Sequence, residues 1–229
     1  MELHPAIRVS TFALGTERAP LLVIDNLVAD AESLVQTAAS KAFTSNGRFY
    51  PGIRAPAPLP YLKLVESRFR NLLRDVFQLK GQTLRFSLCH FSLVTTPADE
   101  LGPLQRIPHV DSLDGSGLAA IHYLFKQDLG GTSFYRHRAT GYETLDEWRW
   151  TAYSHALERE QAGPDAPGAQ YINGNTALFE EISRNDGLFN RMLVYRRNSL
   201  HSGCIARDFA PDPSPLTGRL SINSFIDLI

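Results

Sequence analysis

Two histidines and one aspartate have the types and the spacing that metal chemistry requires. His109 and Asp111 lie two positions apart, and His201 follows in a later segment. Residues two apart in a strand point to the same face of a sheet, so His109 and Asp111 can face one ion. Two imidazoles and one carboxylate leave coordination positions open, which suits non-haem Fe(II) and its oxygen chemistry. The sequence predicts a metal site made of His109, Asp111 and His201.

Each part of this set also has a simpler interpretation. Residues 111–115 are rich in turn formers, so His109 and Asp111 could instead begin an ordinary turn. A single histidine such as His201 is more often a structural residue whose hydrogen bonds are satisfied. The metal prediction therefore depends on the three residues meeting in the fold.

A second polar group lies near the C-terminus, where Arg219, Ser221 and Asn223 alternate with apolar residues. This alternation predicts a strand whose polar face either meets a ligand or is open to water. The proline-rich stretch 211–218 predicts a chain reversal that makes the strands of His201 and Arg219 antiparallel neighbours. Arg219 would then lie about 13 Å along the strand from His201, at about 3.4 Å per residue. A long arginine side chain reaching back leaves room for a five-carbon diacid.

At these residues the chain resembles the Fe(II)- and 2-oxoglutarate-dependent oxygenase superfamily, especially its prolyl-hydroxylase-like branch. The pair His109-x-Asp111, the distal His201 and the pair Arg219-x-Ser221 occur in the superfamily's chain order. The resemblance implies that the first three residues bind the metal. It implies that Arg219 and Ser221 bind the far carboxylate of 2-oxoglutarate through charge-assisted hydrogen bonds.

Other stretches extend the resemblance over most of the chain. Residues 121–125 and 129–134 are similar to the strand and Gly-Gly turn that follow the first metal ligands, and 21–28 is similar to the usual N-terminal entry. The region near 144–170 looks like an insertion. The tyrosine that usually helps to hold 2-oxoglutarate has no clear equivalent upstream of the first ligand. Tyr123 is a candidate for the missing hydroxyl, the alternative being an ordinary core tyrosine.

The resemblance implies a dioxygenase that uses Fe(II) and O2 and converts 2-oxoglutarate to succinate and CO2, usually with hydroxylation of a substrate. A peptide, a protein side chain and a small metabolite all stay open as substrates. A cupin-like metal enzyme that does not use 2-oxoglutarate is one alternative, against which Arg219-x-Ser221 argues. A non-catalytic binding module on the same barrel is another, against which the intact triad argues. Basic residues at 136–138 and Arg207 either meet an anionic group or form a solvated face.

The hydrophobic pattern that must position these residues changes from helical to strand-like near residue 84. Helical spacing follows Asp30 as a candidate N-cap and recurs over 61–79, with Gly81 placed to end that helix. A third helix is predicted over 144–161, where Thr144 and Glu147 have capping-box spacing. Short apolar segments separated by Gly, Pro and Asp predict strands. They are 21–24, 84–95, 118–125, 132–135, 192–196, 200–205 and 220–226.

We therefore expect one domain over 1–229 that is mostly β with flanking α. Its core would be a double-stranded β-helix, the cupin-like jelly roll, with N-terminal helices packed on one sheet. Residues 1–83 would be a mainly helical support, and 84–229 the β core with the insertion near 144–170. The prolines of 50–60 predict an irregular segment that either faces the substrate or only connects helices. Gly130-Gly131 predicts a hairpin turn.

Composition excludes several classes of protein. The 229 residues carry 23 basic and 24 acidic side chains, which gives no sign of nucleic-acid binding. Arginine outnumbers lysine by 19 to 4, which suits carboxylate capture but also fits a GC-rich genome. No apolar run approaches the length of a membrane span, and Cys89 and Cys204 read as buried thiols. We expect a cytoplasmic enzyme with no membrane partner, and leave its oligomeric state open.

Overall fold

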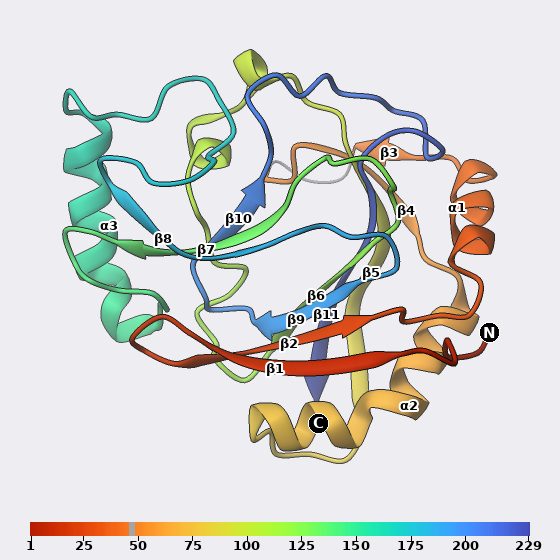
Figure 1. Ribbon diagram of the computed structural model, residues 1–229. Coiled ribbons are helices and arrows are strands. Elements are labelled where there is room, and N and C mark those ends of the chain that lie inside the picture. Colours follow the sequence, from red (N-terminus) through yellow and green to blue (C-terminus); the bar gives the residue numbers. More distant parts are fainter. Residues whose placement is uncertain (46–48) are drawn as a thin grey trace.

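The computed structural model describes residues 1–45 and 49–229, in which two antiparallel sheets face each other (Figure 1). In this part of the chain, eight strands form the larger sheet and three form the smaller one. The larger sheet contains, in spatial order, β1 (Arg8–Leu14), β2 (Ala19–Asp25), β9 (Met192–Arg196), β6 (Leu118–Tyr123), β11 (Leu220–Leu228), β5 (Leu84–Val94), β4 (Gly52–Pro56) and β3 (Thr44–Ser45). The smaller sheet contains β10 (His201–Cys204), β7 (Gly131–His137) and β8 (Phe179–Asn185). The predicted mostly β class is confirmed.

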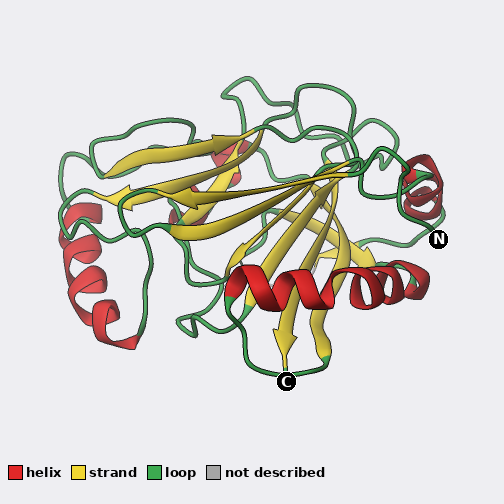
Figure 2. Ribbon diagram, turned by 60° about the horizontal axis from the view of Figure 1, so that its bottom comes forward, coloured by secondary structure: helices red, strands yellow, loops and turns green. Residues whose placement is uncertain are grey.

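Two helices, α1 (Ala31–Ala39) and α2 (Leu59–Phe77), pack on one face of the larger sheet. Their buried apolar residues share a core cluster with side chains from β2, β5, β9 and β11. Figure 2 shows the long helix α2 lying across the strands. The opposite face of this sheet is therefore left to form one wall of a cavity. No helix within the described residues is long and apolar enough to cross a membrane.

Local chemistry sets the ends of the first two helices. The Asp30 side chain accepts a hydrogen bond from the Ser33 N–H, as the sequence predicted for an N-cap. α2 ends earlier than predicted, because Gln78 adopts a left-handed conformation with φ 50° directly after Phe77. Gly81 instead serves the turn into β5, where an added Cβ would lie 2.8 Å from backbone of Leu228. The glycine permits this close approach of the C-terminal strand.

The third helix, α3 (Glu147–Gln161), is not capped by Thr144 as the capping-box spacing predicted. Its N-cap is Asp146, whose side chain accepts from the Arg149 N–H at 2.9 Å. The Thr144 hydroxyl donates to the Glu17 carboxylate instead. α3 lies beside the smaller sheet, next to β8, at the end of the molecule far from α1 (Figure 1).

The N-terminal region was predicted to be mainly helical, but it contains more strands than that prediction included. Residues 1–83 supply β1, β2, β3 and β4 as well as two helices. The prolines of 50–60 do not prevent a strand, because Pro51 and Pro56 flank or end β4 and leave its inner N–H groups free to pair with β5. The predicted hairpin turn at Gly130-Gly131 is also wrong. These residues lead from β6 in the larger sheet to β7 in the smaller one.

A buried carboxylate fixes the chain next to His201. Glu143 accepts hydrogen bonds from the Thr16 and Glu17 N–H groups and from the Arg136 guanidinium. Burial opposes ionisation of Glu143, but these hydrogen bonds outweigh it and hold the pKa of the carboxyl below its ordinary value. The carbonyl of Glu143 accepts from the N–H of Leu200, the residue before His201. The network therefore joins the β1–β2 turn to the segment that presents a predicted metal ligand.

Replacing Glu143 by alanine is expected to lower the free energy of unfolding by about 3 kcal/mol, because Arg136 and two N–H groups lose their acceptor. Urea unfolding measures this loss. Glu180→Ala is the matched control, since Glu180 pairs with the same Arg136 from a more exposed position and should lose less than about 1 kcal/mol. Equal losses in the two variants would contradict the role given to Glu143.

Candidate metal centre

A cavity of about 690 Å³ lies between the two sheets and contains most of the predicted site residues. One wall is the inner face of the larger sheet, with side chains from β4, β6 and β11. The other includes β10 and the chain from 104 to 113, which runs alongside it. Its volume lies within the usual range for sites that bind small molecules, roughly 300–1,000 Å³.

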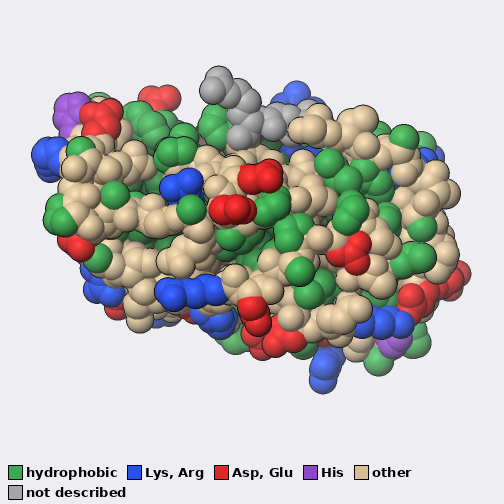
Figure 3. All heavy atoms as spheres, turned by 90° about the horizontal axis from the view of Figure 1, so that it is seen from above, with side chains coloured by type: hydrophobic (Ala, Val, Ile, Leu, Met, Phe, Trp, Pro, Cys, Tyr) green, Lys and Arg blue, Asp and Glu red, His purple; other side chains and the backbone are tan. Residues whose placement is uncertain are grey.

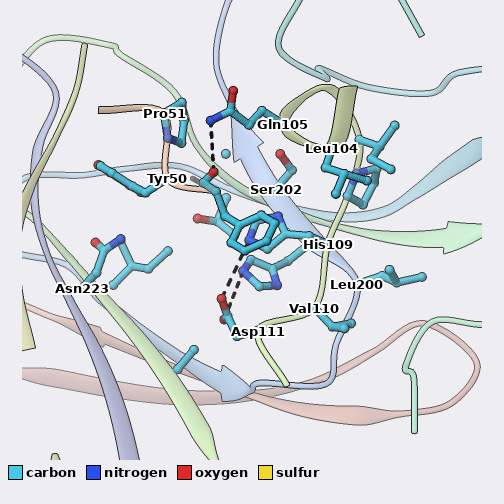
Figure 4. Close-up of a pocket in the computed structure, with 18 of the residues that line it drawn as sticks. Tyr50, Pro51, Leu104, Gln105, His109, Val110, Asp111, Leu200, Ser202 and Asn223 are labelled. Carbon is cyan, nitrogen blue, oxygen red and sulfur yellow. Dashed lines mark hydrogen bonds and ion pairs between the residues drawn. The ribbon is translucent and has the colours of Figure 1, made fainter. Parts of the chain in front are cut away.

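His109, Asp111 and His201 meet in this cavity. One donor atom from each can be chosen so that all three lie within 4.8 Å of one another. Asp111 Oδ1 lies 3.8 Å from His109 Nε2, and Asp111 Oδ2 lies 3.6 Å from His201 Nε2. Figure 4 shows the Asp111 carboxylate directed toward the two rings. The three side chains converge as ligands of a single ion would.

Backbone pairing brings the two histidines together. The His109 N–H donates to the His201 carbonyl at 2.9 Å, and the His201 N–H donates back at 3.0 Å. Residues paired in this way in an antiparallel ladder present their side chains on the same face. His109 forms an isolated bridge with His201 and is not part of a longer strand. The chain bends at Asp111 and Leu113, and a turn follows at 115–116, where Asp114 accepts from the Ser116 N–H. The two interpretations of this segment are compatible.

His201 is oriented by a backbone group. Its Nδ1 lies 2.9 Å from the Ser199 carbonyl oxygen, an acceptor, so Nδ1 carries the proton and donates. Nε2 then faces the cavity, 3.6 Å from Asp111 Oδ2. Metal-binding histidines commonly have such a partner on the nitrogen that does not bind the metal.

The ring of His109 is kept neutral at ordinary pH. Although the His109 side chain is half exposed, desolvation inside the cavity and the nearby His201 ring lower the pKa of His109 below its ordinary value, and the charge of Asp111 opposes this only in part. A neutral imidazole is the form that can bind a metal. Protons therefore compete for this ligand only in acid.

Arg219 reaches the same cavity from the opposite sheet. The prediction that its strand neighbours that of His201 is wrong, because β11 pairs with β5 and β6, whereas β10 pairs with β7. The guanidinium crosses between the sheets, and its Nη2 would lie 3.7 Å from a Cβ added at Gly203. Gly203 follows His201 by two positions on β10, which is about 7 Å along a strand. The arginine thus lies within a small diacid's length of the triad.

The Arg219 side chain is only 6% exposed and has no carboxylate partner among the described residues. Its Nε donates to the Leu129 carbonyl at 2.9 Å and its Nη2 to the Gly131 carbonyl at 2.7 Å. These bonds fix the direction of the guanidinium but supply no negative charge. A buried cation without a counter-ion, beside a cavity, is suited to an anionic ligand.

The polar face predicted for β11 lines the cavity through Ser221 and Asn223, with the Ser221 hydroxyl donating to the Asn223 side-chain oxygen at 2.7 Å. Tyr123 is placed differently. It is fully buried outside the cavity lining, and its hydroxyl lies 2.7 Å from that of Thr132. Thr132 does line the cavity. The structure therefore brings together all the predicted site residues except Tyr123, which contacts the cavity only through Thr132.

Among the cavity residues that sequence reasoning missed are Tyr50 and Arg54, which lie in the segment that its prolines made look irregular. Arg54 lies on β4 with its guanidinium carbon 4.1 Å from the centre of the Tyr50 ring. Burial raises the pKa of Tyr50 and lowers the pKa of Arg54. The segment thus both connects helices and faces the cavity. A lone arginine among prolines and apolar residues was the available signal.

The cavity mouth carries large apolar side chains. Phe49, Leu104 and Trp150 line it while remaining substantially exposed. Trp148 is 93% exposed and lies outside the lining. In the view of Figure 3, hydrophobic side chains lie among scattered charges of both signs. Apolar groups gathered at a mouth favour a ligand with an apolar part.

The basic residues at 136–138 are absent from the cavity lining. Arg136 pairs with Glu143 and Glu180, and His137 lies 2.8 Å from Glu160. Their partners lie within the protein, so these residues help to hold β7 against neighbouring segments. Arg207 borders a separate, smaller pocket.

Solved structures with a similar fold were found, although no curated protein matches the chain. HygX from Streptomyces hygroscopicus with nickel and 2-oxoglutarate bound is 14% identical, with 91% of this chain and 82% of that chain covered and a TM-score of 0.52. HygX with nickel, 2-oxoglutarate and hygromycin B bound is 12% identical, with coverage of 97% and 82% and a TM-score of 0.50. The predicted resemblance to 2-oxoglutarate-dependent oxygenases is confirmed at the level of the fold.

One family profile covers nearly the whole chain, from residue 5 to residue 226. It describes a family of unknown function, DUF6445. The match extends over both sheets, the three helices and all residues of the candidate site. The chain therefore belongs to the DUF6445 family.

Proposed function

We propose that this protein is an Fe(II)- and 2-oxoglutarate-dependent dioxygenase that hydroxylates a substrate not yet identified. One observation carries the proposal: a cavity that holds both a His-Asp-His cluster and a buried arginine with no counter-ion among the residues that the structure describes. The similarity of fold to HygX, which was crystallised with nickel and 2-oxoglutarate, supports it. We also propose that the two sheets form the double-stranded β-helix predicted from the sequence.

His109, Asp111 and His201 would hold the metal. Two imidazoles and one carboxylate suit Fe(II) and leave positions open for other ligands. Their donor atoms already face one another, and His201 is oriented by the Ser199 carbonyl. The donor set therefore fits the proposed ion.

Arg219 and Ser221 would bind the far carboxylate of 2-oxoglutarate, whose 2-oxo acid end would reach the metal. The position of the Arg219 guanidinium beside Gly203 gives the two binding groups a separation suited to a five-carbon diacid. Arg219 can use its remaining N–H groups, because its hydrogen bonds to the Leu129 and Gly131 carbonyls engage only Nε and Nη2. We assign Tyr123 a supporting role, in which its hydroxyl orients that of Thr132 toward the cavity.

When bound, Fe(II) and 2-oxoglutarate would supply the oxidising chemistry, with O2 consumed and succinate and CO2 formed. The protein's own residues position the reactants. Apolar side chains such as Leu200 and Ile107 line the cavity and limit the access of water near the triad. The substrate would enter past the apolar mouth.

Anaerobic addition of Fe(II) and then 2-oxoglutarate to the purified protein tests this function. We expect a visible absorption band from chelation of the metal by the 2-oxo acid, and succinate after O2 is admitted. The protein with Zn(II) in place of Fe(II) serves as the control that should bind 2-oxoglutarate without forming succinate. Absence of both the band and succinate would overturn the proposal.

A further inference from the structure

Arg54 is a second cavity cation without an anionic partner. No ion pair of the described residues includes it. Its Nε is buried and makes no hydrogen bond. The Tyr50 ring below its guanidinium holds the planar group by a cation–π contact but neutralises no charge. Leaving a donor buried and unpaired is unfavourable, so the position favours a ligand that accepts its hydrogen bonds.

Strand register separates Arg54 from the proposed 2-oxoglutarate position. Arg54 on β4 pairs with Ser92 on β5, and Ser92 pairs with Ser221 on β11. Residues paired across a sheet share a face, so Arg54 and Ser221 both face the cavity, about 10 Å apart at two strand spacings. Arg54 therefore lies to the side of the Arg219 position, and the Tyr50 side chain is close to both arginines.

The charges around the cavity also leave Arg54 without a full counter-charge, because Asp111 acts on it electrostatically but makes no ion pair with it. Among the described residues, the charged ones that line the cavity are Arg54, Asp111 and Arg219. Asp111 offsets one arginine, and the two carboxylates of 2-oxoglutarate would offset a divalent ion. One positive charge then remains. A single carboxylate would balance it, whereas a phosphate dianion would leave an excess of negative charge.

We propose that Arg54, held against Tyr50, binds the carboxylate of the substrate, which is a small carboxylic acid with an apolar body. The guanidinium fork matches a carboxylate through two parallel hydrogen bonds. Phe49, Leu104 and Trp150 at the mouth would contact the apolar body. This assignment of a substrate class rests on the proposed function, in which 2-oxoglutarate occupies the Arg219 position.

A panel of acids tests the proposal: 3-phenylpropanoate, 4-phenylbutanoate, indole-3-acetate and octanoate, each paired with its primary amide. Binding to the full chain is measured by saturation-transfer NMR, without additions and with Zn(II) and 2-oxoglutarate present. We expect at least one acid to bind about 10-fold or more tightly than its amide, as the loss of one charge-assisted contact implies. Arg54→Met should abolish this preference and Arg54→Lys should restore part of it. Arg70→Met, an exposed change on α2, should leave it intact.

Three results would overturn the proposal: no acid preferred over its amide, a preference that survives in Arg54→Met, or a loss of 2-oxoglutarate affinity in Arg54→Met as large as the loss of acid binding. The last result would assign Arg54 to the cosubstrate. Unchanged thermal unfolding of Arg54→Met would exclude misfolding as the cause of lost binding. If wild-type protein binds no 2-oxoglutarate with Zn(II), the proposed function fails. In that case, the preference for an acid over its amide, measured without Zn(II) and 2-oxoglutarate, still tests the role of Arg54.

Discussion

Replacing Asp111 by alanine is expected to lower the affinity for Fe(II) by more than about 100-fold, because loss of a partner outside the ligand set already costs about 10- to 100-fold. Asp111 supplies the only anionic donor of the cluster, and its two oxygens face both histidines. Anaerobic titration against a chromophoric chelator measures the affinity. His109→Ala should also lose the metal, since it removes another donor.

Asp114→Ala is the matched control for this experiment. Asp114 lies in the same loop but accepts hydrogen bonds from Ser116 and is absent from the cavity lining. Its removal should leave Fe(II) affinity within about 3-fold of wild type, a difference of less than about 0.7 kcal/mol. Similar affinities in Asp111→Ala and Asp114→Ala would remove Asp111 from the metal site.

Replacing Arg219 by methionine is expected to weaken 2-oxoglutarate binding by about 100-fold, or about 3 kcal/mol, while the metal still binds. The physical reason is that a buried carboxylate of the cosubstrate would lose its charged partner. Titration of 2-oxoglutarate into the Zn(II)-loaded protein measures the change. Arg219→Lys should lose less, since it keeps the charge but not the planar fork.

Metal affinity separates this result from misfolding. Arg219 also donates to the carbonyls of Leu129 and Gly131, so its removal leaves two acceptors without a partner. Some loss of thermal stability is therefore expected, but Fe(II) affinity should stay near that of wild type. Metal loss in Arg219→Met equal to that in Asp111→Ala would indicate a general structural defect, and unchanged 2-oxoglutarate affinity would contradict the assigned role.

Strands with a strong apolar pattern were predictable, and weakly patterned ones were not. β9 was predicted over its full length as residues 192–196, because four of its five residues are buried. β1 was missed because six of its seven residues are exposed and show no alternation that burial could impose. β8 was missed because its sequence is mostly polar, with Phe179 as its one fully buried residue. Edge strands such as β1 depend on their neighbours more than on their own sequence.

The sequence by itself determined which residues are candidates for metal and anion binding in this protein. The types, spacing and order of His109, Asp111 and His201, with Arg219 following, were readable because side-chain chemistry and strand parity are local properties. Those residues meet in one cavity. Their roles as ligands of Fe(II) and 2-oxoglutarate stay predictions that the titrations above test.

Only the tertiary structure decided how the residues meet. Pairing of distant strands depends on the energy of the whole sheet, so the sequence pattern could not show that β10 and β11 belong to opposite sheets. Arg219 therefore reaches the triad across the cavity, where a neighbouring strand had been expected. The same reason applies to Arg54, which lies in a segment without a clear sequence pattern. The pairing of β4 with β5 places this residue in the cavity wall. The arrangement of the binding groups is a property of long-range pairing.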